Sequence, residues 1–136
     1  MASTIAVIGT GYVGLTTGAC FAHLGHSVIC ADIVPEKVDS LQRGEIPTHE
    51  PGLEEIVRVG IRNGTLSFVL GSEHAVVDAE FVYLCVPTPQ TADGSADLRY
   101  LTAAAEQISP HLQPGAVVVN KSTVPVGSTL LVEQAL

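Results

Sequence analysis

Apolar residues in this chain of 136 residues fall in short continuous runs that do not alternate with polar residues. Strands with this pattern are covered on both faces, as in a parallel sheet between two layers of helices. Four runs are strong, and a weaker one follows the turn signal Asn63-Gly64. The pattern predicts strands at residues 4–8, 27–31, 65–70, 81–86 and 116–120.

The segments between these strands carry the start and stop signals of helices. Pro35 and Pro51 each suit the first turn of a helix, and Gly25 and Gly44 suit the position just after its end. In the segment after the first strand, small residues recur at positions 14, 18 and 22, which would allow close packing on a sheet. The predicted helices cover residues 12–24, 35–43, 51–61, 98–108 and 129–136.

Strands that alternate with helices predict an α/β fold, namely a doubly wound, Rossmann-type and mostly parallel sheet with helices on both faces. No internal repeat, low-complexity segment or linker divides the sequence, so we expect one domain over residues 1–136. Ligands of such sheets bind beyond the carboxyl ends of the strands. The residues that directly follow the strands are therefore the candidates for a binding site.

A glycine-rich motif directly follows the first strand. Gly9-Thr10-Gly11-Tyr12-Val13-Gly14 matches G-x-G-x-x-G and opens the first predicted helix. Gly9 would allow a tight turn, Gly11 the close approach of a pyrophosphate, and Gly14 the close packing of helix on strand. The free N–H groups at the start of the helix would attract phosphate. The motif therefore predicts a dinucleotide-binding loop.

Asp32 follows the second strand, at the position where dinucleotide-binding folds carry an acidic residue. Its carboxylate would accept hydrogen bonds from the adenosine ribose and would repel a 2′-phosphate, which predicts NAD rather than NADP. The alternative is that the glycines only pack a βαβ unit and that Asp32 caps the next helix.

Composition excludes several other classes of protein. The formal net charge of −8 argues against a nucleic-acid binder, because phosphate backbones are held by clustered Lys and Arg. The longest apolar runs are far too short to cross a bilayer, and the N-terminus lacks the basic region of a secretory signal. Three cysteines, an odd number, favour a reducing compartment, so we expect a cytoplasmic protein.

Four motifs together resemble the UDP-glucose/GDP-mannose dehydrogenase family. They are residues 6–15, Glu50-Pro51-Gly52-Leu53, Val86-Pro87-Thr88-Pro89 with residues 93–97, and residues 121–127, and they span nearly the whole chain. The Gly-Thr-Gly-Tyr-Val-Gly and Gly-Ser-Ala-Asp-Leu forms are most similar to the UDP-glucose 6-dehydrogenase branch. The resemblance implies oxidation of the 6-hydroxyl of a nucleotide sugar to a carboxylate, in two NAD-dependent steps through a cysteine thioester.

The resemblance also implies the site residues, several of which lie at the carboxyl ends of strands. The threonine that matches Thr123 additionally helps to position the catalytic water in the family, so Thr123 is the catalytic candidate. The alternative is that Thr123 and Ser122 cap the next helix. The expected cofactor-binding residues are Gly9, Thr10, Gly11, Tyr12, Val13, Gly14, Asp32, Lys37, Val86, Pro87, Thr88, Ser122 and Thr123.

The nucleophile of the family, which lies in a glycine-rich motif with Cys-Leu-Pro-Lys-Asp, does not occur in this sequence. Cys20 and Cys30 suit a hydrophobic core, and a reactive role for Cys85 is a minor alternative. The spacing of Cys20, His23, His26 and Cys30 is poor for zinc, so no metal is expected. We therefore expect an NAD-binding domain that ends before its final strand, lacks the central and C-terminal domains of the family, and is inactive alone.

For the full-length enzyme, the expected substrate is UDP-glucose and the expected state is a homo-oligomer. Two alternatives stay open at this point. The enzyme could act on GDP-mannose or a UDP-N-acetylhexosamine, or the chain could be a non-catalytic module whose assembly responds to NAD. An incomplete sheet would leave apolar surface uncovered, which predicts self-association of the isolated chain.

Overall fold

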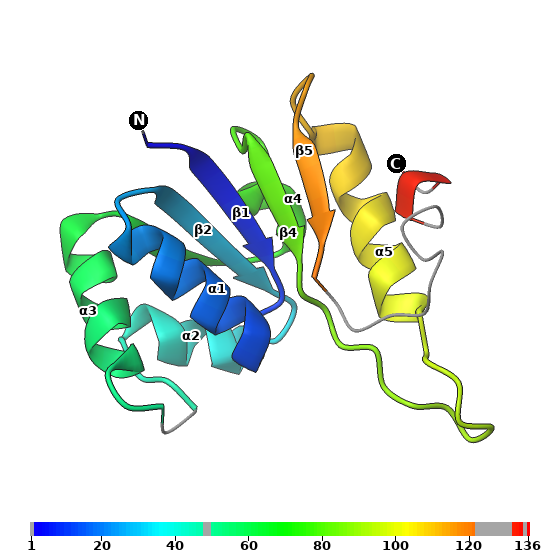
Figure 1. Ribbon diagram of the computed structural model, residues 1–136, viewed down its shortest axis with the longest axis horizontal. Helices are drawn as coiled ribbons and strands as arrows, with labels where there is room; N and C mark the ends of the chain where they lie inside the picture. Colours follow the sequence, from blue (N-terminus) through cyan, green and yellow to red (C-terminus); the bar gives the residue numbers. More distant parts are fainter. Residues whose placement is uncertain (1, 48–49, 122–131, 135) are drawn as a thin grey trace.

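The computed structural model describes residues 2–47, 50–121, 132–134 and 136, and within them the chain forms a five-stranded parallel sheet (Figure 1). The order of the strands is β3-β2-β1-β4-β5, so after β3, at one edge, the chain crosses over β2 and β1 to form β4 on the other side of β1. Every neighbouring pair is parallel. The strands are β1 (Thr4–Ile8), β2 (Ser27–Asp32), β3 (Leu66–Leu70), β4 (Phe81–Leu84) and β5 (Val117–Asn120).

Helices cover both faces of this sheet (Figure 1). On β1, Ile5 and Val7 point into a core shared with the first three helices, whereas Ala6 and Ile8 point into a core shared with the last two. The first group is α1 (Tyr12–His23), α2 (Pro35–Gln42) and α3 (Leu53–Asn63), and the second is α4 (Ser72–Ala75) and α5 (Arg99–Ile108), which a 3-10 turn at Ser109–His111 extends. This architecture confirms the predicted doubly wound α/β fold.

The small residues of α1 allow the close approach to the sheet that their spacing predicts. A Cβ atom at Gly18 would lie 2.5 Å from Sγ of Cys30 on β2, and Ala22 is buried in the same layer. Any larger residue at position 18 would push α1 away from the strand beneath it. None of the helices in the described part of the chain is long and apolar enough to span a bilayer.

The differences from the sequence prediction include two boundaries and one short helix. The third helix begins at Leu53 rather than Pro51, because Gly52 adopts a left-handed φ of +82° in a turn closed by the Leu53 N–H and the Glu50 carbonyl. β4 ends at Leu84 rather than Val86. The short helix α4 was not predicted. The predicted helix at residues 129–136 falls mainly outside the described residues.

Candidate functional site

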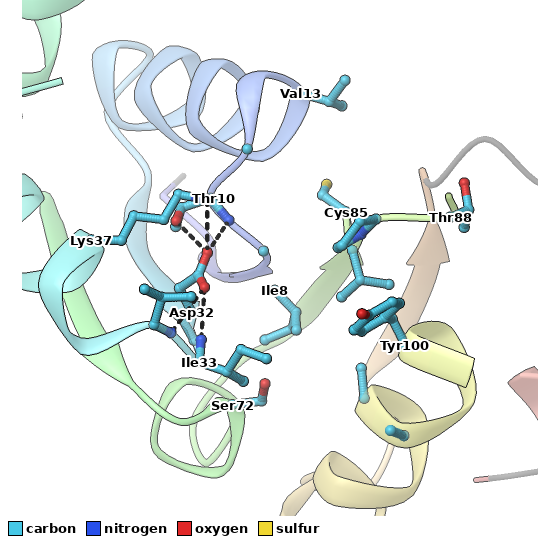
Figure 2. Close-up of a pocket in the computed structure, with 18 of the residues that line it drawn as sticks. Ile8, Thr10, Val13, Asp32, Ile33, Lys37, Ser72, Cys85, Thr88 and Tyr100 are labelled. Carbon is cyan, nitrogen blue, oxygen red and sulfur yellow. Dashed lines mark hydrogen bonds and ion pairs between the residues drawn. The ribbon is translucent and has the colours of Figure 1, made fainter. Parts of the chain in front are cut away.

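A cavity of about 660 Å³ opens at the carboxyl ends of β1, β2 and β4. The chain leaves β1 toward α1 on one face of the sheet, and the segment after β4 leads to α5 on the other face (Figure 1). Such a reversal of direction is where open α/β sheets bind their ligands. Figure 2 shows Asp32 and Lys37 on one side of this cavity and Cys85, Thr88 and Tyr100 on the other.

Two glycines of the motif give the loop between β1 and α1 its shape. Gly9 has a φ of +101°, and a Cβ there would lie 2.5 Å from the carbonyl oxygen of Cys85. A Cβ at Gly14 would lie 1.8 Å from the carbonyl oxygen of Gly9. Both positions therefore exclude every side chain, and the loop packs directly on the backbone of its neighbours.

Gly11 lies in a more open environment than Gly9 and Gly14, because a Cβ there would meet no described atom within 4 Å. It is the N-cap residue of α1, a helix of 12 residues with no side-chain cap and no acidic residue in its first turn among the described residues. The first backbone N–H groups of α1 therefore face the cavity, where the helix macrodipole contributes about half of a positive elementary charge. This end of the cavity suits a phosphate group.

Asp32, the last residue of β2, lies beside the glycine loop (Figure 2). Its Oδ2 accepts hydrogen bonds from the Thr10 backbone N–H, at 2.9 Å, and from the Thr10 hydroxyl, at 2.5 Å. Its Oδ1 accepts hydrogen bonds from the N–H groups of Ile33, at 2.7 Å, and Val34, at 3.2 Å. The ammonium of Lys37 lies 3.5 Å from Oδ2. The carboxylate is thus fully engaged by its own chain.

These contacts determine the charge of Asp32. Burial raises its pKa, but the hydrogen bonds from Thr10, the charge of Lys37 and the N–H of Ile33 together outweigh that effect. The net result is a pKa below 3.8, the ordinary value for aspartate. The cavity therefore contains a fixed negative charge at neutral pH.

This shift predicts a pH-dependent stability. Because the pKa of Asp32 is depressed by folding, its stabilisation is complete above the ordinary pKa of 3.8 and is lost as the pH falls through the lower, folded value. We expect Asp32→Asn to lower the free energy of unfolding by about 2 kcal/mol at neutral pH. Urea unfolding of both proteins between about pH 6 and pH 2 should show this difference shrink toward acid. A difference that is constant with pH would contradict the assignment.

Helix α5 supplies the wall of the cavity that the sequence did not reveal. Gln107 also connects this wall to α4, because its Nε2 donates to Glu73 Oε2 at 2.5 Å. The two apolar residues that follow Asp32, Ile33 and Val34, are exposed and also line the cavity. The lining residues missed from the sequence are Ile8, Ala31, Ile33, Val34, Ser72, Cys85, Tyr100, Ala103, Ala104, Gln107 and Lys121.

Cys85 lines the cavity, which bears on its possible reactivity. Burial raises the pKa of its thiol to about 11, although the positive charge of Lys121 acts in the opposite direction. A thiol with this pKa is protonated at neutral pH and is a weak nucleophile. Of the other two cysteines, Cys30 is fully buried, and burial raises its pKa still further, whereas Cys20 is exposed on α1.

The structure brings most of the predicted site residues together at this cavity. Gly14 does not line it and instead supports the loop from behind. Ser122 and Thr123 lie outside the described residues. Those that line the cavity are Gly9, Thr10, Gly11, Tyr12, Val13, Asp32, Lys37, Val86, Pro87 and Thr88.

Comparison with known proteins finds nucleotide-sugar dehydrogenases among the relatives of this chain. Residues 3–136 match the sequence model described as UDP-glucose/GDP-mannose dehydrogenase family, NAD binding domain. The chain is 47% identical to the UDP-glucose 6-dehydrogenase TuaD of Bacillus subtilis over 129 residues, which are 95% of this chain and 28% of that protein. It is 42% identical to the UDP-N-acetyl-D-mannosamine dehydrogenase of Escherichia coli K12 over 93% of this chain and 29% of that protein.

A solved structure agrees with these sequence relationships. The UDP-glucose dehydrogenase of the archaeon Pyrobaculum islandicum superimposes with a TM-score of 0.94 and 40% identity, over 99% of this chain and 32% of that one. The chain thus spans less than a third of the length of these relatives. The predicted family resemblance and the predicted cofactor, NAD, are confirmed. This chain belongs to the UDP-glucose/GDP-mannose dehydrogenase family and corresponds to its NAD-binding domain.

Proposed function

We propose that this chain holds NAD across the carboxyl ends of β1, β2 and β4, as the cofactor domain of a UDP-glucose 6-dehydrogenase. The observation that carries the proposal is a cavity lined by both the uncapped N-terminus of α1 and the Asp32 carboxylate. The helix end attracts the pyrophosphate. The carboxylate accepts hydrogen bonds from the adenosine ribose and repels a 2′-phosphate, which favours NAD over NADP.

In this proposal, the contacts to NAD come from three segments that the cavity joins. The amides of residues 11–13 face the pyrophosphate, whereas Asp32 and Lys37 face the adenosine ribose. Residues 86–88, which follow β4, face the nicotinamide half from the far side of the cavity.

Two further roles rest on the family resemblance alone. Ser122 and Thr123, which come after β5 in the sequence, are proposed as additional contacts to NAD. We further propose that Thr123 helps to position the water used in catalysis.

The proposed reaction of the full-length enzyme is the oxidation of UDP-glucose to UDP-glucuronate, in which NAD, when bound, accepts a hydride in each of two steps. UDP-glucose is preferred as the substrate because the chain is 47% identical to a UDP-glucose 6-dehydrogenase and 42% identical to a UDP-N-acetyl-D-mannosamine dehydrogenase. The residues from 1 to 136 do not include the Cys-Leu-Pro-Lys-Asp motif of the nucleophile. The chain is therefore proposed to bind NAD without turnover, as a domain that precedes the central and C-terminal domains of the family.

The oligomeric state of the full-length enzyme and its location in the cell are two further proposals. The full-length enzyme is proposed to be a homo-oligomer, which sedimentation velocity of that enzyme tests directly. A cytoplasmic location is proposed because all three cysteines, which lie within the described residues, are free thiols.

Isothermal titration with NAD and with NADP tests the binding function. We expect heat from NAD binding, much weaker binding of NADP, and no NADH when UDP-glucose is added to the chain with NAD. Circular dichroism must show that the chain is folded. A folded chain that gives no heat with millimolar NAD would contradict the binding proposal, and NADH formation above a blank would contradict the proposed absence of turnover.

A further inference from the structure

Thr10 occupies an unusual position for a residue of the glycine loop. It is only 1% exposed, and it is one of two buried polar residues among those that the structure describes, with Ser72. Both its backbone N–H and its hydroxyl donate to the same oxygen of Asp32 (Figure 2). A hydroxyl that is this buried and already hydrogen-bonded to a carboxylate has little surface left for a ligand.

We propose that Thr10 is a positioning residue, which holds the Asp32 carboxylate in the orientation that receives the adenosine ribose of NAD. The proposal rests on the proposed function, because it assumes that NAD occupies this cavity. Asp32 can rotate about two side-chain torsions, and fixing both of its oxygens removes that freedom. The amides of Ile33 and Val34 fix Oδ1, and Thr10 fixes Oδ2. A carboxylate that is already oriented loses less entropy when the ribose binds.

The hydrogen bonds around Asp32 also indicate which contact yields to the ribose. An ionised carboxylate offers about four lone-pair positions, and five groups of the protein already surround this one. Lys37 has the longest contact, at 3.5 Å, and its side chain is 34% exposed, whereas Thr10 is buried. The ribose hydroxyl therefore displaces the ammonium of Lys37 from Oδ2 and leaves Thr10 in place.

The experiment compares two ligands, NAD and its analogue with a 2′,3′-dideoxyadenosine, by isothermal titration of the chain and its variants. Thr10→Val removes the hydroxyl and keeps the shape of the side chain. We expect it to weaken NAD binding about tenfold, because a hydrogen bond to a charged group is lost. It should weaken binding of the dideoxy analogue far less, because that analogue does not use Asp32. Thr10→Ser, which keeps the hydroxyl, should restore the preference for NAD.

Thr16 provides a matched control on α1. Its hydroxyl oxygen is also buried but has no hydrogen-bond partner within the part of the chain that is described. Thr16→Val makes the same chemical change away from Asp32, so it should alter the affinity for neither ligand. If Thr10→Val does not fold, Thr10→Ala gives the same comparison with a smaller side chain.

Two outcomes would overturn the proposal. Equal losses of affinity for NAD and for the dideoxy analogue would mean that Thr10 only supports the loop. Unchanged affinity for NAD would mean that Asp32 keeps its orientation without the hydroxyl. Failure of the unmodified chain to bind NAD at all would instead contradict the proposed function, so the two failures are distinguishable.

Discussion

Gly14→Ala is expected to destabilise the chain by about 3 kcal/mol or more, a large part of the 5 to 15 kcal/mol of a typical domain. The added Cβ would lie 1.8 Å from the carbonyl oxygen of Gly9 and 3.2 Å from the Cβ of Cys85. The Gly9 carbonyl cannot retreat easily, because the Gly9 N–H donates to the Ala31 carbonyl at 2.8 Å and the residue packs on the backbone of Cys85. Urea unfolding followed by circular dichroism measures the loss.

Gly11→Ala is the matched control, since it makes the same substitution in the same loop. A Cβ there meets no described atom within 4 Å, so the free energy of unfolding should change by no more than about 0.5 kcal/mol. If Gly14→Ala were as stable as Gly11→Ala, the close contact between α1 and the glycine loop would be wrong.

The sequence predicted the sheet well because its signal is local. Each strand is a short apolar run, and residues such as Val7 and Ala6 are buried on opposite faces only if helices cover both sides. The prediction failed where the signal was too short or misleading. Helix α4 has four residues, which is too few for a periodic pattern. Pro51 suits a helix start, but Gly52 adopts a left-handed conformation, and the helix therefore begins at Leu53.

The site was predicted in part, for the same reason. The glycine loop and Asp32 follow strands directly, so their common location is a consequence of a parallel sheet. The wall from α5 depends on how the chain returns after β4, and no local pattern marks Tyr100 or Gln107 as neighbours of the loop. The role of Thr10 is also non-local, because its partner Asp32 is 22 residues away. The motif G-x-G-x-x-G leaves this position unspecified, so the sequence alone could only class Thr10 with the cofactor contacts.

Gly11→Val is expected to abolish measurable NAD binding while the fold remains intact, with a loss of affinity of about a hundredfold or more as the pyrophosphate is kept from the amides of α1. Gly11 has a φ of −67° and a ψ of −171°, an extended conformation that valine also adopts. A Cβ at this position would meet no described atom within 4 Å, so urea unfolding should be nearly unchanged. Titration of Gly11→Ala and Gly11→Val with NAD should give losses that grow with the size of the side chain. Tight NAD binding by a folded Gly11→Val variant would mean that the pyrophosphate does not lie at the start of α1.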